Sequence, residues 1–145
     1  MSDSSENSIV VDGSAAEVSA TLFDIAGYPD WSTAIKSVEV LATDGAGRAT
    51  KAKIVIDAGV MRDTVTLDYD WAQAPGRLEF SLDDADLLTE MTGAYLVEDI
   101  GEDQTKVTYE LKVGLSMPVP SMMRKKAELA TIDLALSQLK KKIEE

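Results

Sequence analysis

The sequence predicts an α+β fold in which a long C-terminal helix covers one face of an antiparallel sheet. From Ser37 to Leu115, apolar and polar residues alternate, and turn signals recur about every ten residues, which indicates six consecutive antiparallel strands. After Pro118 and Pro120, apolar residues recur at steps of three and four, which predicts a long helix. Because the sheet has one apolar face, it needs one cover, and this helix is the only element long enough.

The segment before the sheet predicts a short strand followed by two helical pieces. The strand covers 9–11, and Ser14 and Glu17 then form a capping-box pattern that opens the first helix. A second short turn or helix begins at Tyr28. Residues 1–7 are polar and acidic, so we expect a disordered tail there and a single domain over 8–145.

The composition excludes several classes of chemistry. The chain has no His and no Cys, which excludes zinc sites built on thiolate or imidazole, Ser-His-Asp triads, thiol nucleophiles and haem held by His or Cys. A net charge of −12 disfavours nucleic acid as a partner. The acidic run at 83–86 lacks the ligand spacing of a calcium loop, so we predict no metal site, and no motif indicates a cofactor.

Nothing in the sequence predicts a targeting or membrane segment. The N-terminus has no basic stretch followed by an apolar one, and no apolar run approaches the ~18 residues of a membrane span. We therefore expect a soluble, cytoplasmic protein without stable membrane insertion, present as a monomer or a homodimer.

Two short segments and the order of elements resemble a known superfamily. The stretch 9–18 is similar to its opening strand and helix entry, and Tyr28-Pro29-Asp30-Trp31 is similar to its Tyr-Pro-x-Trp motif. Over residues 8–143 the chain resembles the START-like (SRPBCC) superfamily and, within it, actinobacterial single-domain members of the polyketide cyclase/dehydrase and lipid-transport family. More distantly, it resembles the coenzyme Q-binding branch.

This resemblance implies the helix-grip fold, also called START-like or Bet v 1-like. In that fold a curved, seven-stranded antiparallel sheet wraps around the long C-terminal helix, and two short helices lie between strands 1 and 2. The resemblance also implies a hydrophobic cavity for lipids, sterols, polyketides or other apolar molecules. Because activities differ among members of such a fold, the fold alone names no reaction.

The candidate ligand-binding residues lie on the predicted inner face of the sheet, in the turn after the first helices and on the C-terminal helix. Parity along the strands also places Thr89 and Gly93 on this face. Ordinary core packing is an alternative for each of these positions, because parity does not separate a filled interior from a hollow one. The candidates are Trp31, Ile54, Val65, Leu67, Tyr69, Phe80, Met91, Tyr95, Tyr109, Met122, Met123, Leu129 and Ile132.

Three residues are candidates for acid-base chemistry. Asp63 is a carboxylate on an otherwise apolar face, Tyr95 could orient a ligand carbonyl, and Arg124 lies near the expected cavity mouth, where it could pair with Asp63 or an acidic headgroup. The alternatives are an exposed rim position for Asp63, a core ring for Tyr95 and a solvated surface position for Arg124.

The leading hypothesis for function is the binding or transport of a hydrophobic small molecule, such as a lipid, an isoprenoid or a polyketide-like compound, between sheet and C-terminal helix. One alternative is an enzyme of the polyketide cyclase/dehydrase type, resembling an aromatase/cyclase, that uses Tyr, Asp or Arg to move protons. Another is a protein-interaction module or homodimer that uses an exposed apolar patch.

Overall fold

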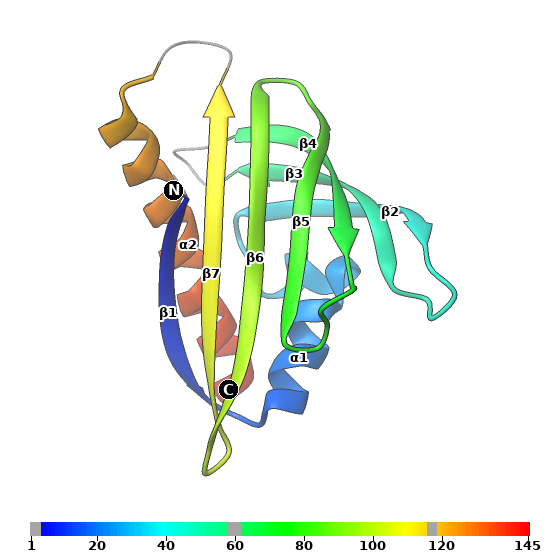
Figure 1. Cartoon of the computed structure of the whole chain (residues 1–145), viewed down its shortest axis with the longest axis vertical. Coiled ribbons are helices and arrows are strands. Elements are labelled where there is room, and N and C mark those ends of the chain that lie inside the picture. The colour runs from blue at the N-terminus through cyan, green and yellow to red at the C-terminus, as the bar shows by residue number, and fades with distance from the viewer. Residues whose placement is uncertain (1–3, 58–61, 116–118) are drawn as a thin grey trace.

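The computed structural model describes residues 4–57, 62–115 and 119–145. All seven strands form one antiparallel sheet in the order β1-β7-β6-β5-β4-β3-β2 (Figure 1). In chain order, the elements are β1 (Ser5–Asp12), α1 (Ala15–Phe23), the 3-10 helix η1 (Ile25–Asp30), β2 (Ile35–Thr43), β3 (Ala49–Asp57), β4 (Arg62–Asp70), β5 (Arg77–Ala85), β6 (Leu88–Gly101), β7 (Gln104–Leu115) and α2 (Ser121–Glu144).

The α+β helix-grip architecture predicted from the sequence is confirmed. Two short helices lie between β1 and β2, six strands follow as a meander, and the long helix α2 ends the chain. The capping box at α1 is also present, because the Glu17 backbone N–H donates to Ser14 Oγ at 3.2 Å and the Ser14 N–H donates to Glu17 Oε1 at 3.5 Å.

The tail predicted for 1–7 is wrong for Ser5, Glu6 and Asn7. These residues belong to β1 and pair with β7, where Ser5 lies opposite Leu111. Their polar side chains add contacts that composition does not reveal, since Asn7 Nδ2 donates to Asp133 Oδ1 of α2 at 2.8 Å. Backbone pairing and these hydrogen bonds order a segment that lacks apolar side chains.

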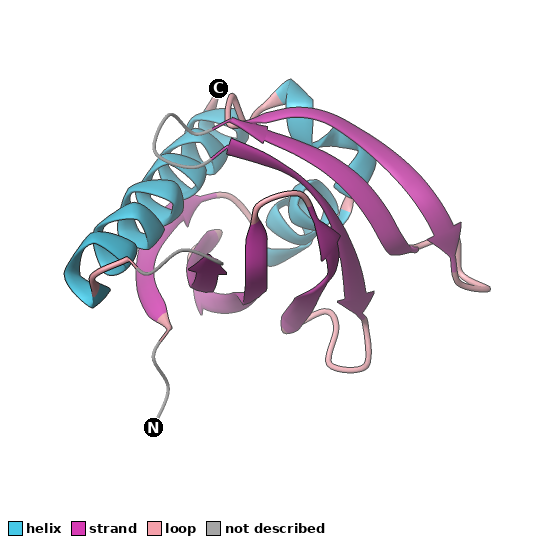
Figure 2. Ribbon diagram, turned by 90° about the horizontal axis from the view of Figure 1, so that it is seen from above, coloured by secondary structure: helices cyan, strands magenta, loops and turns pink. Residues whose placement is uncertain are grey.

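The sheet curves around the side on which the helices lie (Figure 2). Helix α2 packs against β1 and β7, at one edge of the sheet order. Helix α1 packs against β6 and β7, while η1 packs against β2 at the opposite edge. The inner face is therefore covered by α2 along one part and by the two short helices along another.

A buried carboxylate holds α2 against the sheet. Glu128 is 1% exposed and accepts hydrogen bonds from Ser5 Oγ of β1 and the Val113 N–H of β7, both at 2.7 Å. Arg124, one turn earlier on α2, lies 3.4 Å from the same carboxylate. Because each partner satisfies a lone pair of a charge that has left water, Glu128 fixes where α2 crosses the two strands.

The alternation along the strands has one irregularity that decides which side chains face inward. The pairing of β6 with β7 shifts between Leu88 and Glu90, so Leu88 is buried and Thr89 is exposed. The inward position predicted for Thr89 is therefore wrong. An extra residue in one strand reverses the parity of the positions before it.

Replacing Gly93 with Ala should destabilise the sheet. A Cβ at this position would lie 2.5 Å from Phe80 Cζ and 2.6 Å from the Glu110 carbonyl oxygen, and the backbone oxygen cannot rotate away. We expect the free energy of unfolding in urea to fall by about 1–3 kcal/mol. Gly45→Ala is the matched control, since nothing lies within 4 Å of its added Cβ. Equal stability of the two variants would contradict this close approach.

Candidate functional site

A cavity of about 50 Å³ lies between the inner face of the sheet, the segment after η1 and the middle of α2. This volume holds about one or two water molecules. The strands supply most of the wall, the end of η1 and the start of β2 supply one side, and α2 supplies two small side chains. The lining residues are Tyr28, Trp31, Ser32, Ala34, Ile35, Ile54, Ile56, Leu67, Tyr69, Phe80, Met91, Tyr95, Tyr109, Thr131 and Ala135.

Most of the aromatic rings of the protein gather around this cavity. The sequence contains four Tyr, two Phe and two Trp, and all four Tyr, one Phe and one Trp line it. Tyr95 and Tyr109 stack at 4.3 Å between ring centroids, and Tyr28 meets Trp31 edge to face at 5.5 Å. Such contacts hold the rings in defined orientations and expose flat apolar surfaces to the space between them.

The polar groups on the cavity wall are neutral. No acidic or basic side chain occurs among the described lining residues. Burial raises the pKa of Tyr28, Tyr69 and Tyr95 far above the usual value, and it raises the pKa of Tyr109 to about 12, although the hydrogen bond from Tyr95 opposes this rise. At neutral pH the four phenols are therefore hydrogen-bonding groups and not bases.

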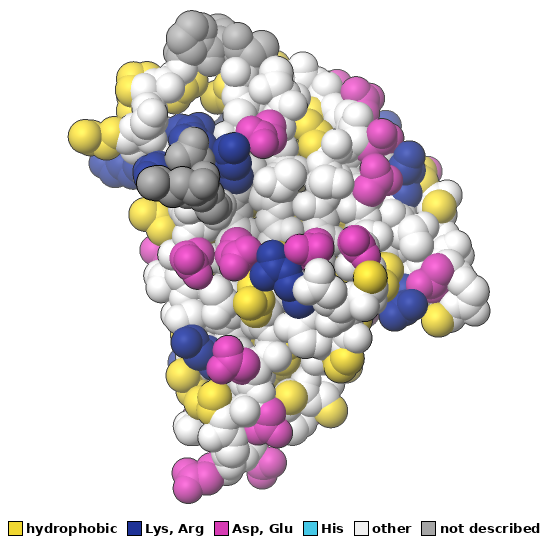
Figure 3. Space-filling view, in the orientation of Figure 1, with side chains coloured by type: hydrophobic (Ala, Val, Ile, Leu, Met, Phe, Trp, Pro, Cys, Tyr) yellow, Lys and Arg dark blue, Asp and Glu magenta, His cyan; other side chains and the backbone are white. Residues whose placement is uncertain are grey.

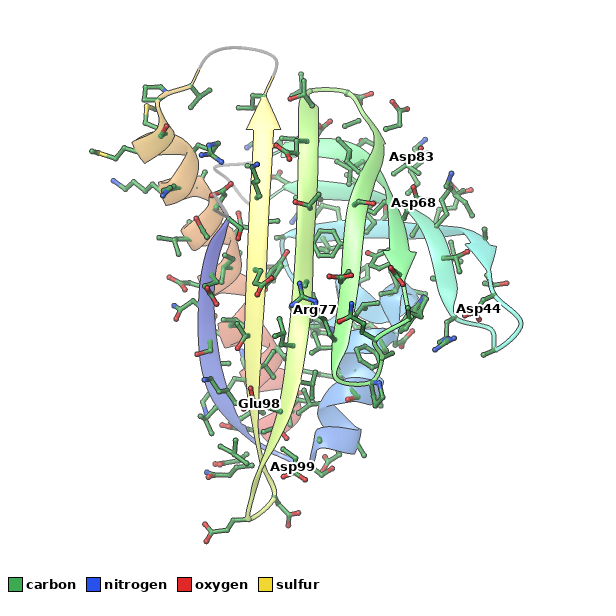
Figure 4. All side chains as sticks on the ribbon, viewed as in Figure 1. Asp44, Asp68, Arg77, Asp83, Glu98 and Asp99 are labelled. Carbon is green, nitrogen blue, oxygen red and sulfur yellow. The ribbon has the colours of Figure 1, made fainter. Side chains whose placement is uncertain are left out.

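A larger hollow of about 420 Å³ lies on the outer face of the sheet, and its wall is charged. Figure 3 shows acidic and basic side chains crossing this face, and Arg77 lies over its middle in Figure 4. Arg77 pairs with Glu79 at 2.9 Å and with Glu110 at 3.1 Å. Since these charges satisfy one another and remain in contact with water, the outer hollow is a solvated surface and the inner cavity is the candidate site.

The structure places eight of the expected ligand-binding residues on the wall of the inner cavity. They come from the segment after η1 and from strands β3 to β7, so chain positions as far apart as 31 and 109 meet around one space. These residues are Trp31, Ile54, Leu67, Tyr69, Phe80, Met91, Tyr95 and Tyr109.

Five expected lining residues lie elsewhere. Met122 is 82% exposed, Met123 is 62% exposed and Leu129 is also exposed, because the buried positions of α2 begin only at Glu128 and continue through Thr131 and Ile132. Val65 and Ile132 are fully buried but pack in the core without reaching the cavity wall. The spacing of apolar residues in α2 predicted which face of the helix is buried. It did not show which residues of that face line the cavity.

Asp63 is buried but serves the backbone of a loop. Its carboxylate accepts hydrogen bonds from four backbone N–H groups. Three of them, at 2.8–3.1 Å, are those of Asp86 and Leu87 in the β5–β6 connection and of Leu88 at the start of β6. The fourth is the N–H of Thr64, at 2.8 Å. Asp63 is buried, so the exposed rim position weighed for it is wrong, and it is not among the residues that line the cavity.

The other two catalytic candidates have different positions. Arg124 lies beside Glu128 and not beside Asp63, so the pairing expected from the sequence is wrong. Tyr95 is on the cavity wall, stacked on Tyr109. Of the three candidates, only Tyr95 can therefore contact a molecule in the cavity.

Sequence reasoning missed several residues of the wall. Tyr28 occupies the same short motif as Trp31, and its Oη donates to the Leu22 carbonyl oxygen at 2.6 Å. Thr131 and Ala135 are four residues apart on α2 and are small, which is a helix-face signal for open space. The remaining missed residues are Ser32, Ala34 and Ile35.

A comparison with protein-family models matches residues 2–144 to the family described as polyketide cyclase/dehydrase and lipid transport. The chain belongs to this family. The resemblance to this family noted in the sequence is thereby confirmed, and the chain has the START-like fold.

Several solved structures share the fold of this protein. A START superfamily protein from Mycobacterium smegmatis is 22% identical, with a TM-score of 0.91 and 97% of each chain covered. The Zhui aromatase/cyclase from Streptomyces sp. R1128 is 16% identical, with a TM-score of 0.73 and coverage of 97% of this chain and 94% of that one. The di-domain ARO/CYC BexL from the BE-7585A biosynthetic pathway is 21% identical over 97% of this chain and 46% of its own, with a TM-score of 0.77.

A search of curated proteins gave no match to this family member. Among the helices of the described residues, none has the length and apolar character needed to cross a membrane.

Replacing Asp63 with Asn should weaken the fold without changing the cavity. An amide has one acceptor oxygen where the carboxylate has two, so part of the loop from Asp86 to Leu88 loses its partner. We expect a loss of about 1–3 kcal/mol in the free energy of unfolding, measured by urea denaturation. Asp86→Asn, at an exposed position of the same loop, is the control and should change stability little. A stable Asp63→Asn variant would contradict this structural role.

The buried tyrosines predict a loss of stability at alkaline pH. Because the pKa of each phenol is higher in the folded protein than the unfolded value near 10, the folded state holds more protons, and its stability falls as pH rises from about 10 toward 12. We expect phenolate absorbance at 295 nm to appear together with the loss of circular dichroism. Phenolate absorbance near pH 10 in a protein with native circular dichroism would contradict this expectation.

Proposed function

We propose that this protein binds a neutral, hydrophobic small molecule in the cavity between the inner face of the sheet and α2, for transport or sequestration. The observation that carries the proposal is a wall rich in aromatic rings and free of charged side chains among its described residues. A charged ligand group would lose its hydration there without gaining an ionic partner. The wall therefore favours neutral ligands.

The shape of the lining favours a flat, unsaturated ligand over a saturated chain. The rings of Tyr69 and Phe80 lie 6.0 Å apart between centroids and are tilted by 47°, and those of Phe80 and Tyr109 lie 6.4 Å apart and are tilted by 59°, so apolar rings follow one another along the wall. The family description includes both polyketide cyclases and lipid transport. Polyketide-like and isoprenoid compounds, which contain conjugated or planar segments, suit this wall better than saturated acyl chains do.

Ligand entry requires the wall to move apart. Pockets for drug-sized ligands measure roughly 300–1,000 Å³, whereas this cavity measures about 50 Å³. On the side of the cavity formed by the segment after η1, two exposed hydrogen bonds join that segment to α2, from the Thr33 N–H to Gln138 Oε1 at 2.9 Å and from Gln138 Nε2 to Thr33 Oγ1 at 2.7 Å. We expect the cavity to widen on this side, because hydrogen bonds open to water are easily exchanged.

A cyclase-type reaction is the second candidate, and the stacked pair of Tyr95 and Tyr109 favours it. The two neutral phenols, whose ring centroids are 4.3 Å apart, can donate hydrogen bonds that orient the carbonyl groups of a polyketide-like substrate. Catalysis would then come from holding the reacting groups of the substrate close together. The structural neighbours named as aromatase/cyclases support this candidate at the level of fold. Asp63 and Arg124, which are bound elsewhere, have no part in it.

Replacing Ala135 with Phe should block ligand binding. Ala135 lines the cavity from α2, and a phenyl ring there would occupy more than the available 50 Å³. With the neutral fluorescent probe N-phenyl-1-naphthylamine, we expect saturable binding to the original protein and an affinity at least about tenfold lower for the variant. Native mass spectrometry of protein purified without detergent should show a retained apolar adduct only in the original protein.

Ala130→Phe is the matched control, because Ala130 lies on the same helix, is exposed and does not line the cavity. This variant should bind the probe as the original protein does. Equal loss in both variants would place the probe on the surface of α2, and an absence of saturable binding to the original protein would contradict the proposed function.

A further inference from the structure

The indole N–H of Trp31 is a buried donor without an acceptor. Trp31 is 9% exposed, and its Nε1 is the one buried side-chain nitrogen or oxygen of the described residues that lacks a hydrogen-bond partner. The other tryptophan shows the ordinary arrangement, since Trp71 Nε1 donates to the Ala49 carbonyl oxygen at 2.7 Å. A buried donor without an acceptor is uncommon and calls for a partner that arrives from outside the chain.

Two other polar groups on the same wall already donate their hydrogens to the backbone. Tyr28 Oη donates to the Leu22 carbonyl oxygen at 2.6 Å, and Thr131 Oγ1 donates to the Ala127 carbonyl oxygen at 2.9 Å. Trp31 lines the cavity beside them. The indole N–H, by contrast, has no internal hydrogen bond that an incoming molecule would have to displace.

The backbone around Trp31 is held in place, so the indole cannot easily turn toward another acceptor. The N–H groups of Trp31 and Ser32 both donate to the Tyr28 carbonyl oxygen, at 3.2 and 2.8 Å. The next residue, Thr33, is bound to Gln138 of α2. The ring also packs edge to face on Tyr28. A donor fixed in this way costs a ligand little reorganisation when it binds.

We infer that Trp31 Nε1 donates a hydrogen bond to an oxygen acceptor of the bound molecule, so that the cavity selects neutral ring compounds that carry a ketone oxygen over hydrocarbons of the same shape. This inference rests on the proposed function. A hydrocarbon offers the N–H no acceptor, whereas a ketone oxygen supplies one. The ketone requires no charged group, in agreement with the neutral wall.

The test compares two small probes of nearly equal shape, 1-indanone and indane, which differ by one carbonyl group. We expect the ratio of their affinities, measured by titration followed by nuclear magnetic resonance, to fall about tenfold in the Trp31→Phe variant, which is equivalent to about 1.4 kcal/mol. Because the ratio is compared between two proteins, the different solubilities of the probes cancel. Trp71→Phe is the matched control and should leave the ratio unchanged, since the N–H of Trp71 is bonded to Ala49.

A second readout uses the original protein alone and does not depend on whether a variant folds. The two indole N–H signals in a ¹H–¹⁵N spectrum are assigned with the Trp71→Phe variant. We expect 1-indanone to move the Trp31 indole N–H signal downfield, because a new hydrogen bond deshields the proton. Indane, which has no acceptor oxygen, should cause no such downfield shift.

The outcomes separate this inference from the proposed function. If both probes bind and the affinity ratio is the same with and without the Trp31 N–H, the inference is overturned and ligand binding stands. If neither probe binds the original protein at millimolar concentration, while N-phenyl-1-naphthylamine does, the selection for small ring ketones is overturned alone. If none of the three probes binds, the inference and the proposed function are both overturned.

Discussion

Covering the apolar inner face of the sheet is the constraint on which the rest of this structure depends. Seven strands present one dry face, and a chain of this length supplies one long helix to cover it. Glu128 fixes where that helix crosses β1 and β7, because its buried carboxylate accepts hydrogen bonds from Ser5 of β1 and from the Val113 N–H of β7. The inner face farther from α2 is covered by aromatic rings from η1, the residue after it and strands β4 to β7, and the cavity lies beside these rings.

Charged side chains are concentrated on the outer face of the sheet, and the wall of the inner cavity is neutral. The outer face holds ion pairs such as Arg77 with Glu110, which remain in contact with water and contribute little stability each. Among the described residues, the buried carboxylates are Asp63 and Glu128, and both are occupied by internal hydrogen bonds. What remains on the cavity wall is neutral, so the protein offers a ligand apolar surface, phenol groups and one unpaired indole N–H.

Much of the architecture could be predicted because it depends on local periodicity. The alternation along β4 placed Val65, Leu67 and Tyr69 inside, and the structure agrees. The prediction failed where pairing between distant strands decides the outcome. Thr89 faces outward because the register of the β6–β7 pairing shifts beside it. Ser5 is ordered because it pairs with β7. Neither pairing can be predicted from the local composition.

The sequence by itself determined the order of elements, the division of the sheet into a dry and a wet face, and the exclusion of histidine and cysteine chemistry, since each depends only on residue type and spacing. Only the tertiary structure decided that Asp63 binds the loop at 86–88, that Met122 and Met123 lie in solvent, and that the Trp31 N–H has no acceptor. The physical reason is that a hydrogen bond or a cavity wall joins residues far apart in the chain, and such distances follow from packing and not from periodicity.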